Sequence, residues 1–145
     1  MILGRLQKQG DQWSADAEVI GAFTQGASLR DAIDMLASLI KLQVGRDGFE
    51  VTIREIGHDE GGATLVYIES RQIGMLAARV LKHQRELHKL TLADVQDRLG
   101  AASVNAYAAY EQGKREPSLS KFQELLAAVA PELAMTVAPR RKLGT

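Results

Sequence analysis

The sequence predicts an α+β protein in two parts: a small N-terminal antiparallel sheet with one helix, then an all-helical domain. Apolar and polar residues alternate with the period of a strand in short runs of residues 1–69. Residues 70–138 instead repeat apolar residues with the period of a helix, and the two parts carry opposite net charge. We expect residues 139–145 to form a disordered basic tail.

Charge and composition narrow the functional class. Residues 1–70 hold 6 basic and 11 acidic side chains, whereas residues 71–145 hold 12 basic and 7 acidic ones. Only the second half has the sign that a phosphate backbone attracts. The sequence has no cysteine, no signal-peptide pattern and no apolar run near the roughly 20 residues that a membrane span needs. We therefore expect a soluble, cytoplasmic protein without a membrane partner.

The first strands are predicted from extended runs and turn residues. Runs over residues 2–9 and 12–19 flank Gly10-Asp11, which is typical of a hairpin turn. Residues 23–26 then predict a short third strand. Ser28 and Asp31 have the spacing of a capping box, so a helix begins there and ends near Val44-Gly45. Its apolar face is expected to contain Leu29, Ile33, Leu36 and Ile40.

Two further strands are expected after this helix. Residues 49–56 alternate between apolar and polar side chains, the pattern of a sheet with one wet face. Gly61-Gly62 predicts a turn, and Leu65 and Tyr67 belong to the returning strand. The apolar positions of the first of these strands are Phe49, Val51, Ile53 and Ile56.

Residues 91–118 predict two short helices joined by a tight turn. Thr91 is a good N-cap for the first helix, and Gly100 can end it in the left-handed conformation. The second helix, residues 103–112, combines an apolar stripe with a small, polar outward face. Such a face lets a helix enter the major groove, where asparagine can pair with adenine. The stripe is Val104, Tyr107 and Tyr110, and the outward face is Asn105, Ala106 and Ala109.

Over about residues 71–133 the sequence resembles the Xre/Cro (Cro/C1-type) class of helix-turn-helix repressors. The parts that match are a long first helix over residues 73–89, the Thr-led second helix, a recognition helix ending in Glu-x-Gly, and a basic turn closing in Pro117-Ser118. A last helix follows over residues 119–130. The resemblance implies that Glu111 pairs with Arg85 of the first helix, as a structural contact rather than a reader of bases.

These positions define a candidate DNA-binding face. Asn105 is the best candidate for direct base contact, with Val104 and Ala106 beside thymine methyl groups. Lys114 and Arg115 follow the helix and would meet the phosphate backbone. We expect Tyr107 and Tyr110 to pack in the core with their hydroxyls at its rim. The full candidate set is Thr91, Ser103, Val104, Asn105, Ala106, Ala109, Lys114 and Arg115.

The N-terminal part resembles the small α+β domain of HicB-family antitoxins, a truncated ribonuclease H-like fold, best over residues 1–44. The resemblance implies a HicA-type toxin that cleaves messenger RNA as a protein partner, and autorepression of the operon through the helical domain. The matching positions are Trp13, Ala15, Ile20, Gly21, Thr24, Gln25, Gly26, Ser28, Leu29, Asp31 and Ala32.

Acidic residues of this part have two interpretations. Asp11, Asp16 and Glu18 could hold metal ions in a nuclease, but Asp11 is a turn residue, and a strand places residues 16 and 18 on one face by its period alone. A solvated surface is therefore the favoured interpretation over a metal site. Such an acidic surface could instead meet a basic toxin, and Trp13 joins these three residues in the candidate toxin-binding set. The histidines, His58, His83 and His88, lack metal-ligand spacing.

We therefore expect a non-enzymatic antitoxin and autorepressor without cofactor or metal. Its expected partners are double-stranded operator DNA, a HicA-like toxin and further copies of itself, because one helix-turn-helix makes too few contacts for specificity. The alternative is a helix-turn-helix regulator whose N-terminal part senses a ligand or only dimerises. The last helix could both complete the domain and form the dimer contact through Leu119, Phe122, Leu125, Leu126 and Val129.

Overall fold

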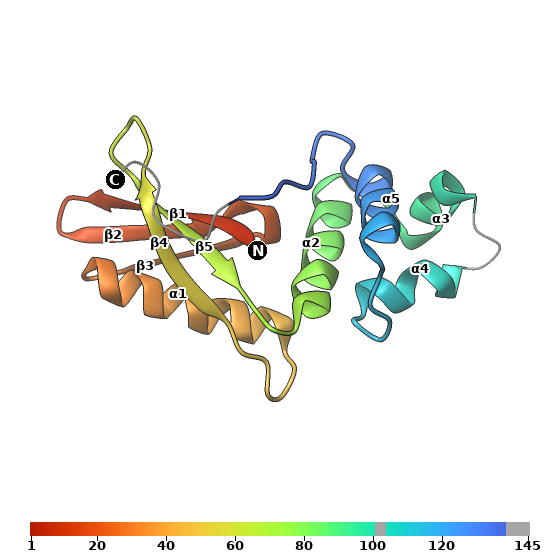
Figure 1. Cartoon of the computed structure of the whole chain (residues 1–145), viewed down its shortest axis with the longest axis horizontal. Helices are drawn as coiled ribbons and strands as arrows, with labels where there is room; N and C mark the ends of the chain where they lie inside the picture. The colour runs from red at the N-terminus through yellow and green to blue at the C-terminus, as the bar shows by residue number, and fades with distance from the viewer. Residues whose placement is uncertain (101–103, 139–145) are drawn as a thin grey trace. The chain divides into compact units, whose positions relative to one another are not determined.

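The computed structural model describes residues 1–100 and 104–138, with Val104 described by its backbone alone. The chain divides into two compact units, which we call the sheet unit, residues 1–73, and the helical unit, residues 74–137 (Figure 1). The predicted basic tail, residues 139–145, and Ser103 lie outside the described residues. The predicted domain limits at residues 69 and 138 stay predictions.

The sheet unit contains one antiparallel sheet of five strands in the order β3-β2-β1-β5-β4. Helix α1 (Leu29–Val44) packs on one face of this sheet, mainly against β3 and β2 (Figure 1). The predicted α+β class is therefore confirmed. The strands are β1 (Ile2–Gln9), β2 (Gln12–Ala17), β3 (Ala22–Gly26), β4 (Thr52–His58) and β5 (Thr64–Glu69).

The core of this unit lies between α1 and the sheet. Alternate residues of each strand point toward the helix, and Leu6, Ala15 and Val66 are among the buried ones. Small residues let the helix come close to the sheet: a Cβ atom at Gly26 would lie 2.5 Å from the backbone nitrogen of Ala32. The helix contributes Ala32, Leu36 and Ile40 to this core.

Strand β2 is shorter than the sequence predicts. It ends at Ala17, and residues Glu18–Ile20 form a 3-10 turn that Gly21 closes in the left-handed conformation, with φ of 66°. The expectation that Asp16 and Glu18 share one face of a strand is therefore wrong. The reason is that the chain turns here to place Ile20 in the core, where it is fully buried, and this turn ends the strand's alternation between the two faces of the sheet.

The ends of α1 follow their capping residues. The Ser28 hydroxyl accepts a hydrogen bond from the Asp31 backbone N–H at 3.0 Å, and Gly45 ends the helix in the left-handed conformation, as predicted. The second half of the predicted capping box is different. The Asp31 carboxylate accepts from the backbone N–H of Ala27 at 2.8 Å, so it holds the residue before the N-cap.

Strand β4 contains an irregularity that alternation alone does not predict. Glu55 pairs with Val66 and Gly57 pairs with Leu65, so Ile56 is the extra residue of a β-bulge. The bulge turns the Ile56 side chain into the core, where it is 2% exposed. His58 is the last residue of this strand.

The helical unit contains four helices: α2 (Ile73–Leu87), α3 (Leu92–Leu99), α4 (Val104–Glu111) and α5 (Leu119–Val129). Helix α2 ends two residues before the predicted Lys89, which has a left-handed φ of 57°. Leu119, predicted in the apolar stripe of α5, is 77% exposed and takes no part in the core, so only its predicted role in a dimer contact stays open as a prediction. As the first residue of the helix, it lies beyond the packed core. The largest fully buried side chains of the core are Leu81, Val95, Tyr107, Leu125 and Val129.

Candidate nucleic-acid interface

Helix α3 is held at both ends by its own sequence. The Thr91 hydroxyl accepts from the Asp94 backbone N–H at 3.0 Å, and the Asp94 carboxylate accepts from the Thr91 backbone N–H at 2.8 Å. Sequence reasoning found the N-cap but missed this reciprocal capping box, although Thr-x-x-Asp is its signal. Gly100 ends the helix with φ of 66°, as predicted. Thr91 is exposed, so its hydroxyl proton can still donate to a phosphate oxygen.

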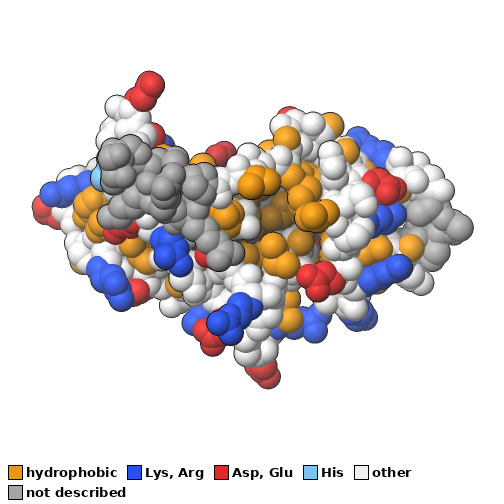
Figure 2. All heavy atoms as spheres, in the orientation of Figure 1, with side chains coloured by type: hydrophobic (Ala, Val, Ile, Leu, Met, Phe, Trp, Pro, Cys, Tyr) orange, Lys and Arg blue, Asp and Glu red, His pale blue; other side chains and the backbone are white. Residues whose placement is uncertain are grey.

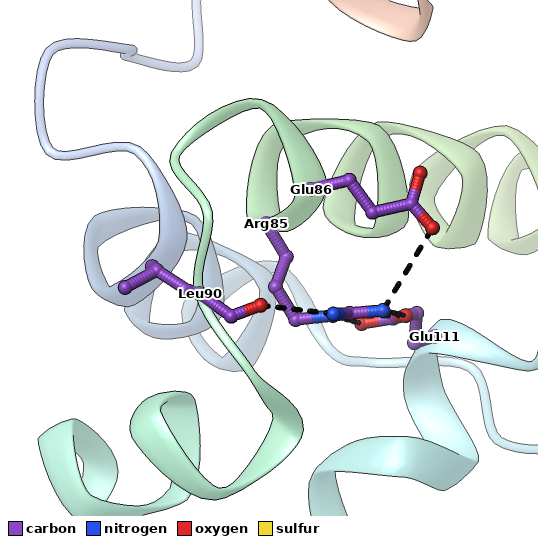
Figure 3. A network of polar contacts seen from close by, with 4 residues as sticks. All are labelled: Arg85, Glu86, Leu90 and Glu111. Atoms are coloured by element: carbon purple, nitrogen blue, oxygen red, sulfur yellow. Dashed lines mark hydrogen bonds and ion pairs between the residues drawn. The ribbon is translucent and has the colours of Figure 1, made fainter.

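An ion pair fixes the C-terminal end of α4. The Arg85 guanidinium, at the end of α2, donates to Glu111 through Nε at 2.8 Å and through Nη2 at 2.6 Å (Figure 3). Arg85 Nη1 donates to the backbone oxygen of Leu90, 2.9 Å away, just before α3 begins. One side chain therefore connects α2, the turn before α3, and α4. Both partners are largely buried, with side chains 15% and 6% exposed.

The tyrosines of α4 face the core. Tyr107 and Tyr110 are 1% and 6% exposed, which agrees with the stripe predicted from helical spacing. The Tyr107 hydroxyl is buried beside Glu111 and does not reach the rim, so this part of the expectation is wrong. Burial, together with the negative charge of Glu111, raises the pKa of Tyr107 above its usual range.

The opposite face of α4 is small and accessible. Asn105 and Ala106 are exposed, and Ala109 is half-buried. No long or branched side chain stands on this face among the described residues of α4, so a groove can approach the helix backbone closely. Two further predicted contacts, Ser103 and the side chain of Val104, lie outside what the structure describes.

Two basic residues follow α4 in a tight turn. Gly113, with φ of 72°, reverses the chain, and the backbone N–H groups of Lys114 and Arg115 both donate to the oxygen of Ala109. Both side chains are exposed. The Arg115 guanidinium lies over the Tyr110 ring, 5.2 Å from its centroid, a cation–π contact that limits how far this charge can move.

A groove that sequence reasoning missed runs beside this turn. It lies between the outward face of α4 and the beginning of α5, where the Ser118 hydroxyl caps the Lys121 backbone N–H at 3.1 Å. The Pro117-Ser118 pair signals the start of a helix, but no spacing in the sequence brings Lys121 beside Ala106. The residues that line the groove are Ala106, Tyr110, Arg115, Glu116, Ser118 and Lys121.

The charge of the helical unit is more balanced than that of the C-terminal half. Residues 74–137 contain 8 basic and 7 acidic side chains, because Arg71 lies in the sheet unit and three basic residues lie in the tail. On the face shown in Figure 2, basic and acidic side chains are interspersed over the helical unit. Attraction to phosphate therefore depends on local groups such as Lys114, Arg115 and Lys121, and on the tail.

The candidate toxin-binding residues are separated by the sheet. Trp13 pairs with Gly26 and lies on the α1 side, whereas Asp16 lies on the opposite face, which we call the open face. Asp11 is exposed in the hairpin turn. Of the four residues, Asp16 and Glu18 interact. Burial is the larger cause that raises the pKa of Asp16, and the negative charge of Glu18 is the second. The structure thus brings together two of the four residues.

No metal-binding cluster is found in the described part of the chain, where no three His, Asp or Glu side chains are grouped suitably. His88 lies one residue beyond α2 and has a structural role. Its Nδ1 is 2.7 Å from the Gln84 backbone oxygen, and its Nε2 is 2.6 Å from Glu132 Oε1. This contact ties the end of α2 to the residues after α5.

Comparison with known proteins agrees with this geometry. Residues 81–129 match the helix-turn-helix family, a segment that includes α3, α4 and α5. No curated protein matches the chain. None of the helices described here has the length and apolar character to cross a membrane. The C-terminal region is therefore a helix-turn-helix domain of the Xre/Cro type, which indicates DNA binding and transcriptional regulation and is typical of non-enzymatic regulators.

Proposed function

We propose that the chain is the antitoxin of a HicAB-type toxin–antitoxin system. In this proposal the sheet unit neutralises a small mRNA-cleaving toxin by binding it, and the helical unit represses the operon that encodes both proteins. The observation that carries the proposal is the combination of a five-stranded antiparallel sheet with one helix and a helix-turn-helix domain in one short chain.

In the proposed complex with operator DNA, α4 lies in the major groove. Asn105 reads a base edge, Ala106 and Ala109 allow close approach, and Val104 and Ser103 complete the face. Thr91, Lys114 and Arg115 contact phosphate oxygens and set the register. Two copies read half-sites about 34 Å apart, because a single helix-turn-helix offers too few base contacts.

Asn105 and Lys114 separate the two kinds of DNA contact. We expect Asn105→Ala to weaken operator binding by about 1–3 kcal/mol and to relax discrimination at one base pair. Lys114→Ala should weaken binding to every sequence alike. It should also reduce the slope of log affinity against log salt concentration by about one unit. Fluorescence anisotropy on operator and scrambled duplexes measures both effects. An equal loss on both duplexes for both variants would show that these roles are wrongly assigned.

The acidic surface of the sheet unit is proposed to meet the toxin. Three carboxylates, Asp11, Asp16 and Glu18, contribute to the acidic excess of this unit, and an mRNA-cleaving toxin needs a basic surface for its substrate. Complementary charge raises the association rate and selects the partner more than it raises affinity. Trp13, on the other side of the sheet, would then support the packing of α1 and would not contact the toxin.

Co-expression with a HicA-type toxin encoded beside this chain tests the antitoxin function. The intact chain should restore growth, and Asp16→Asn/Glu18→Gln should slow association with the purified toxin about tenfold at low salt. A matched control is Asp47→Asn/Glu60→Gln, which removes the same charge from two exposed loop residues. If the toxin kills in the presence of the intact chain, the antitoxin function is excluded while DNA binding can stand.

A further inference from the structure

The sheet has two edges, and they differ in how well they are protected. An edge strand presents unpaired backbone groups, which proteins commonly shield with charged side chains, bulges or proline. Strand β4 has this protection: it carries Arg54 and Glu55, and its bulge between Glu55 and Gly57 breaks the regular row of backbone groups. A further strand is therefore poorly accommodated at this edge.

Strand β3, at the other edge, has none of these features. Its sequence, Ala-Phe-Thr-Gln-Gly, contains no charge and no proline. It pairs with β2 at five consecutive positions without a bulge, so its outer backbone groups form a regular row. Phe23 belongs to this strand, and its side chain is 64% exposed on the open face beside Asp16. An uncharged, regular and partly apolar edge is suited to pairing with another strand.

We propose that β3 pairs with β3 of a second copy of this chain, antiparallel about a two-fold axis at Thr24. The two five-stranded sheets would then form one continuous sheet of about ten strands. Centring on Thr24 uses all five residues and places Phe23 opposite Gln25 of the second copy. This goes beyond the proposed function, because it concerns the sheet unit alone and requires neither toxin nor DNA.

A second copy fits this edge for two reasons. An antiparallel strand is complementary to itself under two-fold symmetry, and two uncharged strands bring no like charges into opposition. The proposed function also places two copies of the helix-turn-helix domain on the operator, and a two-fold contact elsewhere would raise the effective concentration of the second domain. A contact of five residues is small beside the roughly 1,200–2,000 Å² of stable interfaces, so it should dissociate on dilution.

Sedimentation equilibrium of the full chain tests the contact. We expect concentration-dependent association that Phe23→Lys/Gln25→Lys weakens at least tenfold, because this variant places lysines opposite each other at two positions. Both residues are exposed, so folding should persist, and Trp13 fluorescence can verify it. The matched control is Leu3→Lys, which alters a 53% exposed leucine of the inner strand β1 and should associate like the unaltered chain.

A charge swap tests the register. Phe23→Lys/Gln25→Glu places each lysine opposite a glutamate of the second copy, so association should return toward that of the unaltered chain. Amide hydrogen exchange should also show protection of residues 22–26 that increases with protein concentration. The proposal is overturned if Phe23→Lys/Gln25→Lys associates like the unaltered chain. It is also overturned if this variant keeps its self-association and loses only toxin binding, which would place Phe23 in the toxin contact beside Asp16.

Discussion

Replacing Glu111 by alanine is expected to lower the free energy of unfolding of the helical unit by about 3 kcal/mol. The variant leaves Arg85, whose side chain is 15% exposed, without its bidentate partner. It also removes the group that joins the end of α4 to α2 (Figure 3). Urea unfolding followed by circular dichroism at 222 nm measures the change, because helices dominate that signal.

Glu86→Ala is the matched control for this prediction. Glu86 lies 4.0 Å from Arg85 Nη2, and its side chain is 51% exposed, so its loss should cost less than about 0.5 kcal/mol. Arg85→Met/Glu111→Leu should recover much of the stability, because it removes both charges from the protein interior. Equal urea midpoints for Glu111→Ala and Glu86→Ala would contradict the role given to the Arg85–Glu111 pair.

Gly26→Ala is expected to destabilise the sheet unit by about 3 kcal/mol or to prevent its folding. The added Cβ would lie 2.5 Å from the nitrogen and 2.8 Å from the Cα of Ala32, which are backbone atoms of α1. The helix would have to move away from the sheet, and this overpacking affects the whole core. Trp13 pairs with Gly26 across β2 and β3, so its fluorescence reports unfolding at this position.

Gly61→Ala provides the comparison for Gly26→Ala. Its Cβ would meet the Asp59 carboxylate at 3.4 Å, an ordinary contact, and Gly61 is exposed in the β4–β5 turn. We expect a change within about 0.5 kcal/mol. A Gly26→Ala variant that unfolds at the same denaturant concentration as Gly61→Ala would show that α1 does not pack against β3 as described.

The fold was predictable where it is determined by local chemistry. Thr91 begins its helix, and Gly45 and Gly100 end theirs, as expected, because caps and left-handed glycines act within one turn of the chain. The bulge at Ile56 and the turn at Glu18 were not predictable in this way. Both depend on which side chains the core can accept once distant strands have paired, and a local pattern does not contain that information.

In the candidate site, too, some features were predictable from the local sequence and others were not. Helical period alone separates the buried Tyr107 and Tyr110 from the exposed Asn105 and Ala106. The stacking of Arg115 on Tyr110 requires the chain reversal at Gly113, which spacing along the sequence does not describe. In the sheet unit, Trp13 and Asp16 are near in sequence yet lie on opposite faces, because the strand alternates between them.

Titration of the full chain against its own promoter fragment and a scrambled duplex of equal length tests the function of the α4 face. Anisotropy at low ionic strength, repeated at increasing salt, gives both affinities and their salt slopes. We predict that the promoter is bound about a thousandfold more tightly than the scrambled duplex. Equal affinity for both duplexes, or no binding to either, would contradict the assignment of this face to DNA reading.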